Sequence, residues 1–105
     1  MDAEEANWLF DFAIDSLRKD AIFLEIDIES KEKAISHVDM CLKNYGDLND
    51  ICGNASHQGL DIAFLETEKG MASKALDALG KDLIGVEERI ATVLCERKKH
   101  LGNGG

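Results

Sequence analysis

Residues 10–28 read FDFAIDSLRKDAIFLEIDI, and the spacing of apolar residues in this stretch decides the fold. Steps of four and three residues from Phe10 land on apolar side chains throughout it, and a second run of the same spacing begins at Ile62. A repeat of 3.5 residues is typical of coiled coils and long helical bundles. We call these positions the seam. They are Phe10, Ile14, Leu17, Ala21, Leu24, Ile28, Lys31, Ile35, Val38, Leu42, Tyr45, Asn49 and Cys52 in the first run, and Ile62, Leu65, Lys69, Ala72, Leu76, Leu79, Leu83, Val86, Ile90 and Val93 in the second.

A strand is the competing interpretation for part of this stretch. Residues 22–28 alternate between apolar and polar side chains apart from Phe23, and that period of two is typical of a strand. Acidic residues followed four positions later by lysine favour a helix instead, because this orientation stabilises helices. Such pairs are Asp15/Lys19, Asp27/Lys31, Glu29/Lys33, Asp39/Lys43 and Asp77/Lys81. Asp27/Lys31 begins within the disputed segment and Glu29/Lys33 begins directly after it, so we predict a helix there.

The chain contains no proline, so no long segment is forced to break. A turn-like cluster at residues 53–59 divides it into two arms. The expected fold class is all-α, either a long antiparallel helical hairpin or a three- to four-helix bundle, with coiled-coil-like heptad seams. A turn capped by Ser30 in the polar residues 29–33 would divide the first arm, but the seam keeps its phase across them, which favours one continuous helix. Gly70, Gly80 and Gly85 predict either a close helix approach or a split near Gly80. We expect one domain over residues 1–101 and a flexible tail at 102–105.

The charge distribution supports the hairpin and limits the partners. The start of the first arm is acidic (Asp2, Glu4, Glu5, Asp11, Asp15) and the end of the second is basic (Arg97, Lys98, Lys99), so folding back would bring opposite charges together. The formal net charge of −9 argues against nucleic acid and against an anionic membrane. Most of that charge lies in the first half, which favours a basic or amphipathic protein partner.

The cysteines and the N-terminus predict a cytoplasmic protein that stays where it is made. Three cysteines at unpatterned spacing do not form a disulfide framework. The first residues are acidic, whereas a signal or transit peptide would be basic. No stretch is apolar enough for a membrane span. We therefore expect free cysteines in a reducing compartment, with Cys41 and Cys52 in the helix core.

No set of residues predicts catalysis or metal binding. His37 and Cys41 lie one helical turn apart, with Cys52 and His57 nearby in sequence, but two ligands on one helix are only half of a zinc site. No histidine has the Glu three residues before it that a di-iron bundle requires. A histidine phosphotransfer domain is similar in length and helical class, yet its His-x-x-Lys-Gly motif matches neither His37 nor His57. We predict no catalytic, cofactor-binding or metal-binding residues and no enzyme. The alternative is a histidine phosphotransfer or other enzymatic helical bundle.

A second apolar stripe on the first arm is the feature nearest to function. At 100° per residue, Trp8, Phe12, Phe23 and Ile26 lie about 160–220° from the seam of the same helix. A helix that is apolar on two sides must be covered on two sides. The cover is a further helix of the same chain, a second copy or a different protein. We therefore predict a non-catalytic protein-protein interaction module (a subunit, adaptor or small chaperone) that associates through heptad-spaced apolar helix faces. It forms a homo-oligomer or a hetero-oligomer and uses these four residues as its interface.

Overall fold

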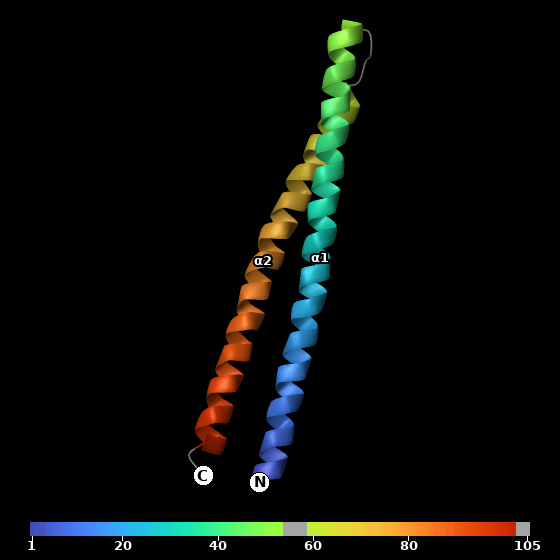
Figure 1. The fold of residues 1–105 in the computed structure, drawn as a ribbon. Helices are drawn as coiled ribbons and strands as arrows, with labels where there is room; N and C mark the ends of the chain where they lie inside the picture. The colour runs from blue at the N-terminus through green and yellow to red at the C-terminus, as the bar shows by residue number, and fades with distance from the viewer. Residues whose placement is uncertain (54–58, 103–105) are drawn as a thin grey trace. The chain divides into compact units, whose positions relative to one another are not determined.

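The computed structural model describes residues 1–53 and 59–102. They form two α-helices, α1 over Ala3–Cys52 and α2 over Gly59–Gly102 (Figure 1). Within these ranges there is no strand, so the helix predicted over residues 22–28 is confirmed. Neither helix has the combination of length and apolar character that a membrane crossing requires. Most of the expected turn at 53–59 and of the expected tail at 102–105 lies outside the described residues.

Both helices continue through the points where the sequence allowed a break. α1 runs through Ser30 and α2 runs through Gly80, so the possible turn and the possible split are wrong. An ion pair of 3.1 Å between the Glu29 carboxylate and the Lys33 ammonium spans the polar stretch of α1. The other interpretation of the α2 glycines, that they allow the helices to approach closely, is wrong too. A Cβ added at Gly70, Gly80 or Gly85 would meet nothing within 4 Å. These glycines mark neither a break nor a close helix approach.

Local signals explain where α1 begins and ends. The Asp2 carboxylate accepts a hydrogen bond of 2.8 Å from the backbone N–H of Glu5, which makes Asp2 the N-cap. Glu4 and Glu5 add negative charge to the first turn, where the helix dipole favours it. Gly53 follows the last helical residue with a φ of 63°. This left-handed conformation suits glycine and terminates the helix.

The chain divides into two compact units, each built from one segment of α1 and one of α2. The first unit comprises Met1–Ile26 and Leu79–Gly105, and the second comprises Asp27–Ala78. In each unit the two helical segments lie side by side and run in opposite directions (Figure 1). This is the antiparallel pairing expected of a helical hairpin. The described residues contain no third or fourth helix.

Burial in both units follows the seam. Ile14 and Val86 are buried in the first unit, together with Ala6, and Val38 is buried in the second. The other seam residues from Phe10 to Tyr45 and from Ile62 to Val93 are half-buried. Asn49 and Cys52 are exposed, so the expectation that Cys52 lies in the helix core is wrong. The α2 seam starts only at Ile62, and the last turn of α1 therefore has no described seam residue of α2 beside it.

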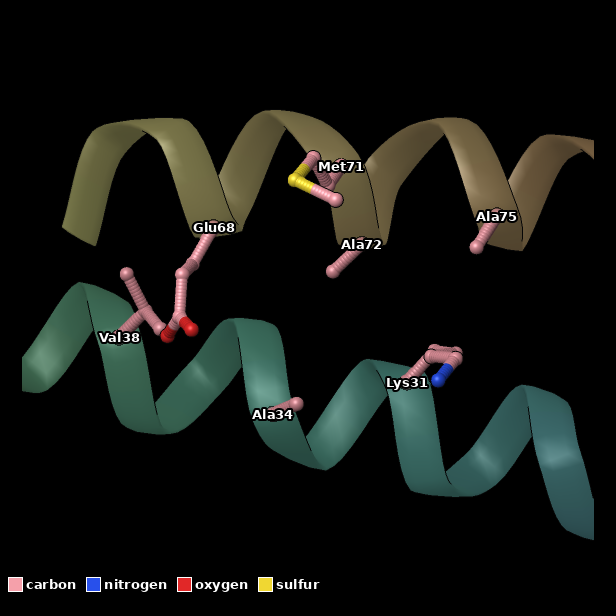
Figure 2. Close-up of a pocket in the computed structure, with 7 residues that line it drawn as sticks. All are labelled: Lys31, Ala34, Val38, Glu68, Met71, Ala72 and Ala75. Carbon is pink, nitrogen blue, oxygen red and sulfur yellow. The ribbon is translucent and has the colours of Figure 1, made fainter. Parts of the chain in front are cut away.

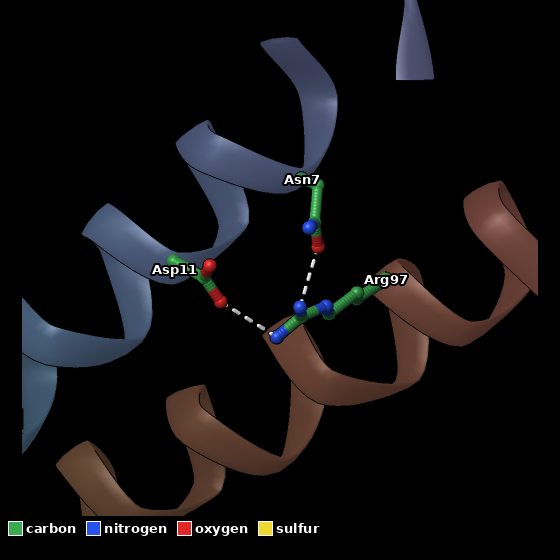
Figure 3. Close-up of polar contacts among 3 residues, drawn as sticks. All are labelled: Asn7, Asp11 and Arg97. Atoms are coloured by element: carbon green, nitrogen blue, oxygen red, sulfur yellow. Dashed lines mark hydrogen bonds and ion pairs between the residues drawn. The ribbon is translucent and has the colours of Figure 1, made fainter. Parts of the chain in front are cut away.

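In the first unit, a single basic residue of α2 forms the expected contact with the acidic start of α1. The Arg97 guanidinium lies 2.8 Å from the Asp11 carboxylate and donates a second hydrogen bond to the side-chain carbonyl of Asn7 (Figure 3). Lys98 is exposed, and Lys99 pairs with Glu96 of its own helix at 3.5 Å. Of these three basic residues Arg97 alone reaches across, because it lies on the less exposed side of α2. Its planar guanidinium then serves two acceptors at once.

We expect Arg97→Ala to lower the free energy of unfolding by about 0.5–1 kcal/mol, because the ion pair is partly solvated and each bond is therefore weak. Urea unfolding at low and high salt measures the effect, which should shrink as salt screens the pair. Lys98→Ala is the matched control and should change stability by less than half as much. Equal effects of the two substitutions would show that the contact with Asp11 and Asn7 contributes nothing.

Candidate protein-interaction surface

Large apolar side chains stand exposed on α1 in the first unit. Trp8, Phe12 and Phe23 are 65%, 63% and 66% exposed, and Ile26 is 57% exposed. These are the four residues that the sequence predicts as an interface. No described residue of the chain covers them, because α2 lies against the seam on the other side of α1. That they contact another protein stays a prediction.

Ile22 belongs to the same surface, and sequence reasoning missed it. It is 53% exposed and lies one helical turn before Ile26. Its spacing could have revealed it, since residues four apart share a helix face. The period-two alternation of residues 22–28 drew attention to a strand instead. We call Trp8, Phe12, Ile22, Phe23 and Ile26 the outer face.

The outer face is apolar at both ends and polar in the middle. At one end the rings of Trp8 and Phe12 stack, with their centroids 5.8 Å apart. Ile22, Phe23 and Ile26 form the other end. Between them lie the exposed side chains of Asp15 and Lys19. This contact between two side chains of one helix leaves both rings mostly open to water.

Hollows in the first unit lie next to the outer face and at the seam. One is lined by Glu4, Glu5, Trp8 and Leu9 and is open to solvent. Another lies where the helix ends meet, and its lining is almost entirely apolar: Met1, Ala6, Leu9, Phe10, Ala13, Val93 and His100. The His100 ring packs edge-on against Phe10, with centroids 5.9 Å apart. His100 therefore has a packing role at the end of the seam.

A hollow in the second unit results from small seam-side residues. Alanines of both helices leave space between α1 and α2, and Lys31 and Glu68 extend into it at different ends (Figure 2). Its lining consists of Lys31, Ala34, Val38, Glu68, Met71, Ala72 and Ala75. Lys31 and Glu68 do not form an ion pair with each other, so the hollow lacks the converging polar groups of a binding site. The other seam lysine, Lys69, forms an ion pair of 2.6 Å with Asp39 of α1.

The candidate metal ligands do not gather. The Cys41 thiol lies 3.8 Å from the His37 ring on the same helix, while Cys52 is exposed. No cluster of three or more ligand side chains occurs among the residues that the structure describes. His57 lies outside them. The geometry here is a contact between neighbouring turns of one helix.

Exposed apolar residues also occur outside the outer face, and the sequence analysis did not single them out. In the second unit these are Met40, Leu48, Ile51, Phe64 and Met71, and in the first they include Leu9, Ile84 and Leu94. Among the residues that the structure describes, the outer face alone has three exposed aromatic rings and two exposed isoleucines on one side of one helix.

Comparison with protein-family models, curated proteins and solved structures found no match to the chain. The function must therefore be argued from the surface itself.

Proposed function

We propose that the chain is a non-catalytic protein-interaction module, acting as a subunit, adaptor or small chaperone, and that it associates through the outer face of α1. The observation that carries this proposal is the exposure of Trp8, Phe12, Phe23 and Ile26, each more than half open to solvent on the side away from the seam. Clusters of large exposed apolar side chains on a helix, such as those at the two ends of the outer face, usually mark an interface.

The energetics favour a covered face. Burying a side chain of this size contributes about 1.5–3 kcal/mol, so four of them together approach the 5–15 kcal/mol that stabilises a whole domain. Tryptophan and other aromatic residues are also frequent among the few residues that dominate binding energy. A partner that covers this face would therefore gain enough to bind stably.

A second part of the proposal concerns how the two helices pack against each other along the seam. Residues at 3.5-residue spacing are the less exposed ones along both helices. We propose that they interlock as knobs into holes, the packing of coiled coils. The acidic surface around the outer face would then select partners by electrostatics.

The proposed location is the cytoplasm. Cys41, Cys52 and Cys95 are free in the structure, and two of them are exposed. Exposed thiols persist in a reducing compartment, whereas an oxidising one favours disulfides.

Photocrosslinking at Phe12 tests the proposed function. Replacing Phe12 by p-benzoylphenylalanine keeps an aromatic ring at this position. The matched control places the same group at Ile84, which is 57% exposed on α2 of the same unit but outside the outer face. On illumination in cells that make the protein, we expect an adduct with a protein chain at residue 12 and little at residue 84. Adducts at neither position, or equal adducts at both, would contradict the proposed function.

A further inference from the structure

The residues along the outer face are spaced symmetrically, with the same sequence of intervals from either end. Its heptad positions are Trp8, Phe12, Asp15, Lys19, Ile22 and Ile26, separated by steps of 4, 3, 4, 3 and 4 residues. If an identical helix is laid against it in the opposite direction, with the centre at the level of Leu17, then Trp8 faces Ile26 and Phe12 faces Ile22. At the centre Asp15 faces Lys19, and all three pairings occur twice.

We infer that the outer face binds the outer face of a second copy of this chain, antiparallel, about a two-fold axis at the level of Leu17. This inference rests on the proposed function and names its partner. A two-fold interface requires a surface that is complementary to itself, in which residue i meets residue j and residue j meets residue i. The heptad positions of the outer face meet that requirement, because each apolar residue faces an apolar residue and Asp15 faces Lys19.

Charge decides the orientation and the register. Antiparallel pairing centred on Leu17 puts each Asp15 opposite a Lys19. Parallel pairing would place Asp15 against Asp15 and Lys19 against Lys19. A shift of the antiparallel register by seven residues would bury both charges against isoleucine. Like charges in contact and unpaired charges against apolar groups are both costly, so one arrangement is favoured.

Asp15 and Lys19 are available for this role. Both are exposed, and neither takes part in an ion pair within the described chain. Glu29 and Lys33 have the same i,i+4 spacing and do pair with each other.

The rims of the interface extend the apolar contact on one side. Leu9 would lie near the second copy's Phe23 on that rim, and Ser16 would lie near its own copy beside the axis. On the other rim Arg18 would approach the second Arg18, and Asp11 of each copy would approach Glu25 of the other. These like-charge contacts are solvated, and water and salt weaken the repulsion.

The area is adequate for a dimer. The five outer-face side chains expose about 600 Å² per copy, taking roughly 200 Å² for a whole side chain of this size. A specific interface of standard size buries about 800 Å² per partner. Leu9 and the aliphatic part of Lys19 supply much of the difference.

Charge reversal tests the pairing. The variants Asp15→Lys and Lys19→Asp each place like charges opposite each other twice, so we expect the dimer dissociation constant of each to rise at least tenfold. Mixed in equal amounts, they restore the opposite-charge pairs, and we expect a heterodimer as tight as the wild-type dimer. Sedimentation equilibrium with differently tagged chains measures both. The double variant Glu29→Lys with Lys33→Glu is the matched control, since it reverses an i,i+4 pair outside the outer face.

Each result has a distinct meaning. Weakened single variants that recover on mixing support the antiparallel pairing, because an effect within one chain cannot be repaired by a second chain. A wild-type dimer that neither reversal weakens would overturn the register. A wild-type monomer at high micromolar concentration would overturn the second-copy inference. In that case an adduct of Phe12 with a different protein would leave the proposed function standing, and no adduct would remove both.

Discussion

Replacing Ile14 by alanine is expected to lower the free energy of unfolding by about 2–4 kcal/mol, the cost of deleting a large buried aliphatic group and leaving a cavity. Ile14 is 4% exposed, one of the few residues of the chain that are nearly removed from water. It lies in the first unit, where Ala6 and Val86 are the other buried residues. With so small a core, one truncation removes a large fraction of the stabilising contacts.

Ile84→Ala is the matched control for this substitution. Ile84 is the same residue type in the same unit, but its side chain is 57% exposed. We expect its truncation to change stability by no more than about 0.5 kcal/mol. Chemical unfolding followed by circular dichroism measures both variants. Equal losses at the two positions would show that the assigned phase of the helices is wrong.

The local pattern of the sequence was sufficient to predict which side of each helix is buried. Ile14, Val38 and Val86 all lie on the seam, because apolar residues with a period of 3.5 can meet another helix only on one side. The unbroken phase of the seam across Ser30 favoured a continuous α1, whereas the continuity of α2 at Gly80 could not be predicted in this way. A glycine costs about 1 kcal/mol in a helix, an amount that packing along many turns readily exceeds.

Contacts between the helices were harder to predict than burial. The charge distribution predicted that the acidic start of α1 attracts the basic end of α2. It could not select Arg97 over Lys98 or Lys99, because the choice depends on which side of α2 faces α1 at that level. Of the five expected acid–lysine pairs, Glu29/Lys33 forms within α1, whereas Asp39 pairs with Lys69 of α2 instead of Lys43. Such exposed pairs differ little in energy, so geometry decides between them.

The candidate surface was largely predictable, and its partner was not. Trp8, Phe12, Phe23 and Ile26 share a helix side by spacing alone, and all four are exposed. Ile22 was missed because the alternation around it resembles a strand. A further helix of the same chain, a second copy or a different protein could each cover such a face. The residues of the face do not decide between them, because the choice depends on the residues of the partner.

Replacing Trp8 and Phe12 together by serine is expected to abolish association while leaving the helices intact. The two rings stack on each other and contact solvent, so the chain's own core does not depend on them. At an interface, two buried aromatic residues are worth about 3–6 kcal/mol, which weakens a dimer at least a hundredfold.

The matched control replaces Phe64 and Met71 by serine. These residues are as exposed as Trp8 and Phe12 but belong to the second unit and are not part of the outer face. We expect this variant to associate like the wild type. If this control variant also failed to associate, the loss of any exposed apolar surface would explain the effect, and the outer face would have no special role.

Sedimentation equilibrium of the purified wild type and of the Trp8→Ser/Phe12→Ser variant, with circular dichroism on the same samples, tests most directly whether the outer face is an interface between chains. The expected result is a wild-type mass of twice the 11.6 kDa chain and a variant mass of one chain, with equal helix content. A variant that is monomeric because it has unfolded would contradict the account, since Trp8 and Phe12 would then belong to the chain's own core. A variant that keeps the wild-type mass would contradict it equally.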